Sequence, residues 1–214
     1  MYSYFRVVAL AFDNQDENLG VYFSECADEI RNVIPPKLLK TLIEISGEAL
    51  NIVNIDTRLS QINNAGFIFC AYSHGTITSL NSRKIAYLKS EENIHNLKNS
   101  FTYTNACLAG YKLGPEIIEK GGRAFLGYKE EVDAIILDEQ HKKISIRCDN
   151  YALILFLNNY SVKEAWVSAK EHYNNQIDRI VFQSPIIAGI LRENRDSLVA
   201  YGDLELTMED LLRK

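Results

Sequence analysis

Apolar residues fall into short runs separated by polar turns along the first 130 positions, a pattern typical of alternating strands and helices. Strand-like runs cover residues 5–12, 50–55 and 66–72, and two more begin at Ser100 and Arg123. Between them, apolar residues recur every three or four positions and predict helices, which lie around residues 23–30, 38–46 and 56–62. This order of strand and helix predicts parallel strand pairing with right-handed crossovers.

Helical spacing dominates the second half of the chain. A helix is expected from about Pro115, and three others are expected over residues 151–157, 161–177 and 184–192. The helix that begins at Ser161 carries the capping box Ser161-x-x-Glu164, in which each residue bonds the backbone of the other. A last strand is predicted over residues 197–201.

Two segments have a weaker pattern and are expected to lie beside a functional site. Residues 75–89 predict a small hairpin that turns at Asn81-Ser82, and a polar helix is expected after it over residues 91–98. Residues 129–149 combine mixed charge with little periodicity. A structureless segment of this length is usually functional, so we expect a mobile loop or a peripheral hairpin there.

Composition narrows the class of protein. With 214 residues and 47% apolar content, the chain can bury one substantial core, and a single domain over residues 1–214 is expected. A net charge of -5 without a run of Lys or Arg argues against nucleic-acid and membrane binding. The apolar N-terminal run is too short to span a bilayer and is interpreted as the first strand. The cysteines show no C-x-x-C spacing, which favours free thiols in a reduced, cytoplasmic protein.

Two of the predicted strands end in residues that carry chemistry. The run Gly66–Gly75 (GFIFCAYSHG) closes on His74, and the run Ser100–Gly110 (SFTYTNACLAG) leaves its strand at small residues around Cys107. If these strands are parallel neighbours, their ends meet at one edge of the sheet, where ligands and reactive groups collect in open α/β folds. The pattern therefore predicts a Cys/His pair.

Such a pair is typical of nucleophilic catalysis. A thiol reacts as its thiolate, and an imidazole that takes the proton supplies that form near neutral pH. We expect the backbone N–H groups of Cys107 and Gly75 to face a developing oxyanion, and a helix starting near Cys107 to add the positive end of its dipole. The alternative is a buried structural thiol beside a histidine that is hydrogen-bonded within a turn. The joint placement at two strand ends favours catalysis.

These motifs resemble those of the caspase-like cysteine peptidases, which include caspases, metacaspases, gingipain-type proteases and the bacterial CHAT group. In that family a His-Gly closes one strand and an Ala-Cys-x-Gly closes the next; here the matching segments are YSHG and TNACLAG, with one residue more before the glycine. GGRAFLGY, SVKEAW and YGDLEL are similar to later segments of the family. The resemblance implies a caspase-like three-layer α/β/α sandwich with a mostly parallel central sheet.

The same resemblance implies a cysteine endopeptidase that cleaves a protein or peptide substrate through an acyl-enzyme, with His74 and Cys107 as the catalytic dyad. Bacterial relatives of this type act in antiviral defence or programmed cell death, where a partner protein or a small nucleotide signal switches them on. Segments 76–89 and 129–149 are the candidates to respond to such a signal. The alternative is a catalytically silent caspase-like module that binds a partner or small signal and acts by conformational signalling.

Two residues are candidates for substrate binding. Asp13, in the loop after the first strand, is a candidate to line a pocket for Lys or Arg, against the alternative of a solvated loop acid. Asn105 lies two positions before Cys107 and is neutral, whereas metacaspases commonly have an acidic residue there and caspases a glutamine. The sequence therefore does not decide between a preference for a basic and a preference for an acidic P1 side chain in the substrate. No metal or cofactor is expected, because Cys70 lies within an apolar strand and no glycine-rich phosphate loop follows the first strand.

Overall fold

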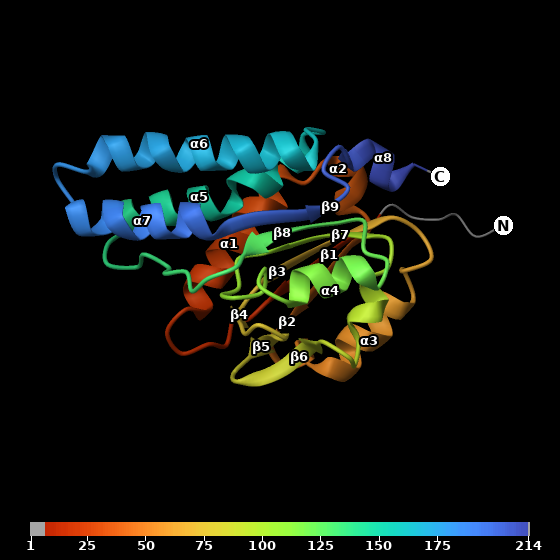
Figure 1. Ribbon diagram of the computed structural model, residues 1–214. Coiled ribbons are helices and arrows are strands. Elements are labelled where there is room, and N and C mark those ends of the chain that lie inside the picture. Colours follow the sequence, from red (N-terminus) through yellow and green to blue (C-terminus); the bar gives the residue numbers. More distant parts are fainter. Residues whose placement is uncertain (1–6, 214) are drawn as a thin grey trace.

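A six-stranded sheet forms the centre of the protein, whose computed structural model describes residues 7–213 (Figure 1). Its strand order is β2-β1-β3-β7-β8-β9, and every neighbouring pair is parallel except β8 and β9. The strands are β1 (Val7–Phe12), β2 (Leu42–Ser46), β3 (Phe67–Tyr72), β7 (Ser100–Thr104), β8 (Ala124–Tyr128) and β9 (Leu198–Gly202). A smaller antiparallel sheet contains β4 (His74–Gly75), β5 (Ser79–Ser82) and β6 (Ile85–Lys89).

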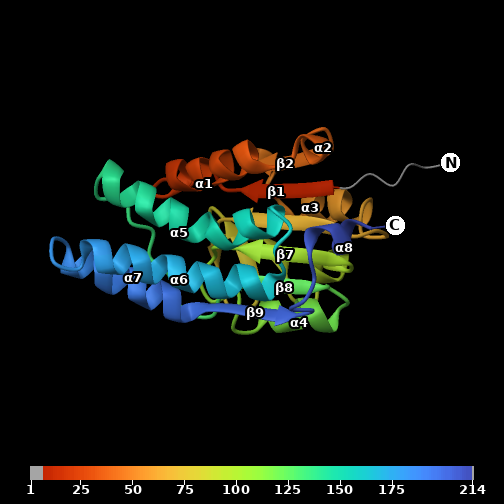
Figure 2. The same cartoon turned by 90° about the horizontal axis from the view of Figure 1, so that it is seen from above.

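Helices cover both faces of the large sheet, as the two views in Figures 1 and 2 show. On one face lie α1 (Gly20–Val33), α5 (Glu139–Leu157) and α6 (Val162–Ile180), and α7 (Pro185–Ser197) packs along α6. On the other face lie α3 (Ile52–Ser60), α4 (Leu113–Glu119) and the small sheet. The remaining elements are short: α2 (Pro36–Leu39), α8 (Met208–Leu212), and the 3-10 turns Gly47–Ala49 and Ile94–Leu97. The expected three-layer α/β/α sandwich is therefore confirmed.

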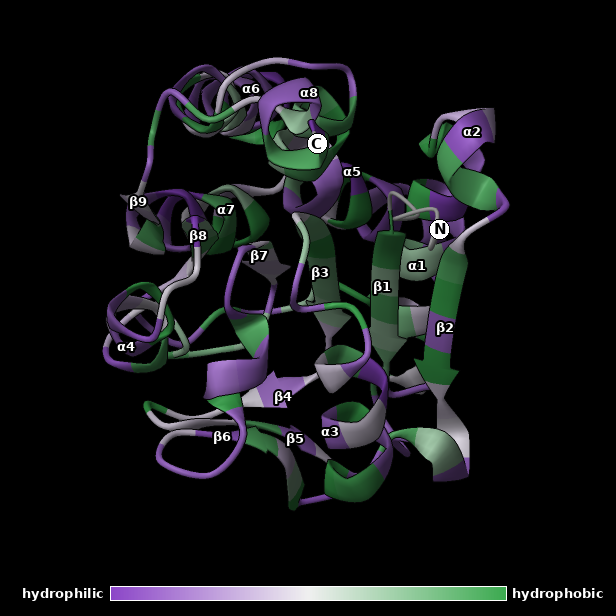
Figure 3. Ribbon diagram, turned by 90° about the vertical axis from the view of Figure 1, so that its right-hand side faces the viewer, coloured by the Kyte–Doolittle hydropathy of each residue, from purple (hydrophilic) through white to green (hydrophobic). Residues whose placement is uncertain are grey.

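Alternating side chains of the central strands contribute to two apolar clusters, one on each face of the large sheet. In β1, Val8, Leu10 and Phe12 point to the face covered by α1 and α5, where they join one apolar cluster. Their neighbours Val7, Ala9 and Ala11 point to the opposite face and join a second cluster with α3 and α4. Because β1 is buried on both faces, it is apolar at every position, as its colouring in Figure 3 shows.

Several elements follow the sequence prediction closely. β3 and β7 are parallel neighbours, with Ala71 beside Thr104 at their last pair. The helix predicted at 161–177 is α6, and its capping box is complete, since the Glu164 N–H donates to Ser161 Oγ and the Ser161 N–H donates to Glu164 Oε2. Residues 5 and 6 of the first predicted strand lie outside the described residues.

The prediction for residues 38–55 is wrong. Of the helix expected over 38–46, only Leu38 and Leu39 are helical, as part of α2 (Pro36–Leu39), and Leu42–Ser46 is the edge strand β2, which pairs Ile43 and Ile45 with β1. The strand expected at 50–55 is instead the first turn of α3, whose Asn51 side chain accepts a hydrogen bond from the Asn54 N–H. An N-cap of this kind starts a helix, and the apolar residues after it also fit a helical period.

Two loop predictions also need correction. Residues 129–149 are a loop only as far as Asp138, which caps α5; buried Ser145 and Asp149 interrupt the apolar stripe and conceal the helix. The hairpin turns at Arg83-Lys84, where both residues have positive φ, and not at Asn81-Ser82. The polar helix expected over 91–98 is reduced to the 3-10 turn at Ile94–Leu97.

Candidate active site

His74 and Cys107 lie at the same edge of the large sheet. β3 ends two residues before His74, and the neighbouring parallel strand β7 ends three residues before Cys107. Gly75 packs directly against this second chain, because a Cβ on Gly75 would lie 2.5 Å from the Cys107 carbonyl oxygen and 2.8 Å from the Ala106 Cβ. Only glycine allows so close an approach. The two strand ends are therefore held against each other.

A small pocket lies between these strand ends. Its lining contains His74, Cys107 and Asn105 from the strand ends, Tyr22 and Phe23 from α1, and Val132 and Ala134 from the segment after β8. The free space is about 30 Å³, which holds one or two water molecules. In this conformation a peptide side chain cannot enter it.

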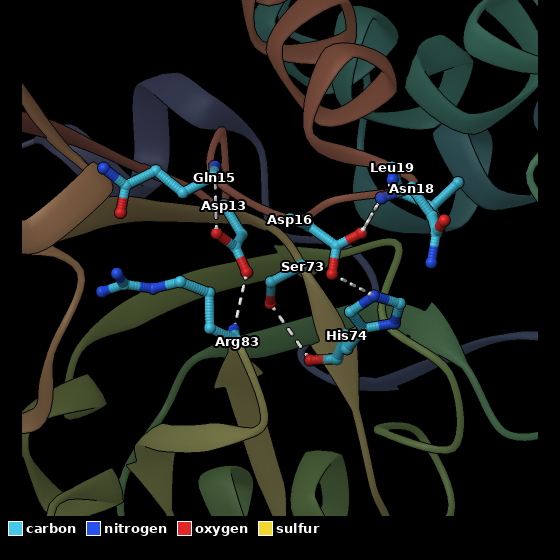
Figure 4. A network of polar contacts seen from close by, with 8 residues as sticks. All are labelled: Asp13, Gln15, Asp16, Asn18, Leu19, Ser73, His74 and Arg83. Atoms are coloured by element: carbon cyan, nitrogen blue, oxygen red, sulfur yellow. Dashed lines mark hydrogen bonds and ion pairs between the residues drawn. The ribbon is translucent and has the colours of Figure 1, made fainter.

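Asp16 orients the His74 ring, as Figure 4 shows. Its Oδ2 lies 3.0 Å from His74 Nε2, while the Phe23 ring meets the imidazole edge-on with centroids 5.6 Å apart. With Nε2 engaged by the carboxylate, Nδ1 is the nitrogen left for proton exchange. The sequence pattern alone gave Asp16 no role. Its place after β1, next to β3 in the sheet, is the signal from which its role can be inferred.

The Asp16 carboxylate is itself held in place. Partial burial raises its pKa, but the N–H groups of Leu19 and Asn18 and the neighbouring His74 ring lower it more, so that its pKa lies below the ordinary value. Asp16 is therefore ionised at neutral pH and acceptor-only, which favours the His74 tautomer with a proton on Nε2.

Cys107 is partly covered and bonded to the segment that follows β8. The Val132 N–H donates to its Sγ at 3.4 Å, and the thiol lies 3.5 Å from the Val132 carbonyl oxygen. Burial raises the pKa of Cys107, and the charges of Glu131 and Asp133 act in the same direction against the Val132 N–H, so the thiol is protonated at neutral pH. The expected helix-dipole contribution is wrong, because α4 begins only at Leu113.

Asn105 lies in the pocket with one atom unsatisfied. Its Nδ2 donates to Asp149 Oδ2 at 3.4 Å. Among the described residues three buried side-chain atoms have no hydrogen-bond partner, and Asn105 Oδ1 is the one that belongs to the pocket lining. A buried acceptor without a donor is costly unless a ligand or water supplies one. Asn105, a candidate substrate-binding residue from the sequence, thus lines the same pocket as His74 and Cys107.

Asp149 forms the polar floor beside Asn105. It is buried, and its carboxylate accepts hydrogen bonds from the hydroxyl groups of Tyr22, Tyr128 and Tyr173. Burial raises its pKa, although the surrounding donors oppose the shift. Asp149 does not stand out in the sequence, because it lies in a segment whose weak periodicity predicts a loop.

Asp13 has contacts different from those expected. It is buried, its Oδ2 accepts the Arg83 N–H at 2.9 Å, and its Oδ1 accepts the Gln15 N–H at 3.3 Å (Figure 4). These bonds hold the tip of the β5–β6 hairpin against the loop after β1. Asp13 is neither a solvated acid nor part of the pocket lining.

Within residues 7–213 no cluster of three or more His, Cys, Asp or Glu side chains is arranged to hold a metal ion. The same part of the chain contains no helix with the length and apolar content needed to cross a membrane.

No known family model matches the sequence, and no curated protein sequence matches it. Solved structures do match. Gingipain R, an Arg-specific cysteine proteinase, superposes with a TM-score of 0.59 at 12% identity over 94% of the chain. The complex of the pro- and mature domains of RgpB from Porphyromonas gingivalis gives 0.58 at 13% identity over 94% of the chain. The chain spans about half of those proteins, 47% and 48% of their lengths. Together with the sheet order and the strand-end site, this likeness shows that the chain has the fold of the caspase-like cysteine peptidases.

Proposed function

We propose that the protein is a cysteine endopeptidase with Cys107 as nucleophile and His74 as acid/base. The observation that carries this proposal is that both side chains, placed by adjacent parallel strands, line one pocket. The fold is that of a protein described as a cysteine proteinase, which supports the proposed peptidase function. The 12–13% identity supports the fold alone, so the residues of the pocket have to carry the chemistry.

In the first half of the reaction, Cys107 Sγ attacks the carbonyl carbon of the scissile peptide bond and its proton passes to His74. Because Asp16 engages Nε2, we assign Nδ1 as the nitrogen that takes the proton. The N–H groups of Gly75 and Cys107 stabilise the oxyanion of the tetrahedral intermediate. As the intermediate collapses, the C–N bond breaks, His74 protonates the leaving amine, and a thioester remains on Cys107. Water, deprotonated by His74, then attacks the thioester carbonyl carbon, the C–S bond breaks, and His74 returns the proton to Cys107 as the carboxylate product leaves.

Asn105 is the proposed substrate-binding residue. Its Oδ1 is a buried acceptor in the pocket lining and lacks a donor. A substrate N–H that reaches this atom would satisfy it, which favours substrates with a donor at that position over apolar analogues.

The resemblance to bacterial caspase-like proteins supports a further part of the proposal. The protein would act in the cytoplasm as a regulated effector in antiviral defence or programmed cell death, activated by a partner protein or a small nucleotide signal. The protonated, partly covered Cys107 thiol fits a protease that is held inactive until such a signal arrives.

The test compares the wild-type protein with Cys107→Ala and His74→Ala on a peptide library, with and without an extract of the source cell. Each single change is expected to lower kcat/KM by about 10³-fold or more. Cys148→Ala and His95→Ala are the matched controls and should cleave like the wild type. Cleavage that survives Cys107→Ala would overturn the proposal. If both dyad variants also keep the biological activity, the protein is the silent signalling module instead.

A further inference from the structure

The segment between β8 and α5, residues 129–138, crosses the carboxyl edge of the sheet where the proposed nucleophile lies (Figure 1). Two of its contacts cover the turn that carries Cys107. The Leu108 N–H donates to the Glu130 carbonyl at 3.0 Å, and the Val132 N–H donates to Cys107 Sγ at 3.4 Å. Val132, Asp133 and Ala134 also form one wall of the pocket. The segment therefore occupies space that a substrate backbone needs in order to reach the thiol.

This segment is anchored on α7 by one side chain. Asn194 is 2% exposed, its Oδ1 accepts the Asp133 N–H at 3.2 Å, and its Nδ2 donates to the Asp133 carbonyl at 3.0 Å. The Asn194 side-chain amide therefore pairs with both the N–H and the C=O of Asp133, as the backbone of a neighbouring strand does in a sheet. A second anchor follows two residues later, where the Ile135 N–H donates to Ser145 Oγ at 3.3 Å on α5.

The anchored segment also keeps the thiol unreactive. Glu131 and Asp133 bring negative charge close to Cys107, and the segment contributes to the burial of the sulfur. Both effects disfavour the thiolate and together outweigh the Val132 N–H of the same segment, which favours it. Displacing the segment removes these effects and widens a pocket whose free space is now about 30 Å³.

We propose that residues 129–138 form an autoinhibitory strap, held over Cys107 by Asn194 and Ser145, and that the strap must lift before the thiol can react. This inference rests on the proposed function for one point only, namely which reaction of Cys107 the strap prevents. The closed strap and its anchors stand on the contacts alone. An activating signal then needs only to favour the lifted strap over these few hydrogen bonds.

The test is the rate at which iodoacetamide alkylates Cys107, followed by mass spectrometry on Asn194→Ala, Ser145→Ala and the wild type. Losing either anchor should raise the Cys107 rate by about tenfold, because each variant removes one or two hydrogen bonds from the closed state. Asn175→Ala, an exposed change on α6, is the matched control and should alkylate at the wild-type rate. Buried Cys26, Cys70 and Cys148 report any general unfolding in the same sample.

Hydrogen exchange on the wild type provides a second measurement that needs no variant. The amides of Val132, Asp133 and Ile135 should be protected, since each is bonded in the closed strap. Unprotected exchange at these amides, or folded anchor variants that alkylate at the wild-type rate, would overturn the strap. Faster alkylation without any peptide cleavage would instead uphold the strap and count against the peptidase.

Discussion

At the scale of single residues, the Asp16–His74 pair matters most for the proposed chemistry. A dyad of Cys and His leaves the ring free to rotate and to change tautomer, and either change spoils proton transfer. Asp16 removes both freedoms through one bond of 3.0 Å, while the edge of the Phe23 ring limits the remaining motion. We therefore regard Asp16 as a positioning residue that acts through His74.

Replacing Asp16 by Asn should lower kcat by tenfold or more while KM changes little, because the change affects proton transfer and not substrate contacts.

The same replacement should change how the stability of the protein depends on pH. Since the pKa of Asp16 is lowered in the folded protein, its stabilising contribution is complete above its ordinary value of 3.8 and is lost as pH falls through the lower, folded value. Urea titrations should therefore show that the difference in unfolding free energy between wild type and Asp16→Asn shrinks as the pH falls from 5 to 3. These two pH values lie about one unit above and below the ordinary pKa of 3.8.

Exposed Asp178 provides the matched control for this change. Asp178→Asn should leave kcat unaltered. A stability difference for Asp16→Asn that grows toward low pH would contradict a lowered pKa of Asp16.

At the scale of elements, α6 and α5 behave in opposite ways toward sequence patterns. α6 has one apolar stripe and a complete capping box, so its sequence alone predicts the helix. α5 is the same length but buries polar Ser145, Asp149 and Asn150 among apolar neighbours. A helix with buried polar groups on its inner face has no clean stripe, although its cap at Asp138 is a normal start signal.

The capping box of α6 should be measurable on its own. Ser161→Ala removes the oxygen that accepts the Glu164 N–H and frees one end of the helix. We expect a loss of about 1 kcal/mol in unfolding free energy, measured as a shift of the urea midpoint at unchanged slope. Ser168→Ala, in the middle of the same helix, is the control and should change stability by no more than about 0.5 kcal/mol. Equal shifts for the two variants would mean that the cap contributes nothing.

At the scale of the whole molecule, Asp149 joins the helical layer to the sheet. Its carboxylate receives Tyr22 from α1, Tyr128 from β8 and Tyr173 from α6, and Asn105 adds a contact from the proposed active site. In a buried network of this kind, the low local dielectric strengthens each hydrogen bond. The same residues thus support the layers and the pocket.

Asp149→Ala should destabilise the protein by about 3 kcal/mol or more, because it removes a buried carboxylate that accepts hydrogen bonds from four buried side chains. Asp149→Asn keeps the shape and one acceptor and should cost less stability.

Because burial raises the pKa of Asp149, its contribution to the stability of the fold is largest below the ordinary value of 3.8 and is lost as pH rises through the raised value. The wild type should therefore lose stability relative to Asp149→Asn as pH rises in that window, as urea titrations can measure. A constant difference across pH would refute the raised pKa.

The fold class follows from the sequence because burial on both faces forces continuous apolar strands, and such strands are recognisable one at a time. The runs that became β1, β3 and β8 are of this kind, whereas β7 is buried at every position but alternates Phe101 and Tyr103 with serine and threonine. Edge strand β2 is different, since Leu42, Ile43 and Ile45 fit a helical as well as a strand pattern. Pairing with β1 decided between the two, and pairing is not a local property.

The sequence by itself also determined that His74 and Cys107 stand at the ends of two strands, because small and polar residues after an apolar run mark where a chain leaves a sheet. The tertiary structure alone decided which residues surround them. Asp16, Val132, Asp149 and Asn194 come from four separate parts of the chain, and only the packing of α1, α5 and α7 around the sheet brings them to the pocket and its strap. Contacts between distant segments depend on the relative placement of whole elements, and no local pattern encodes that placement.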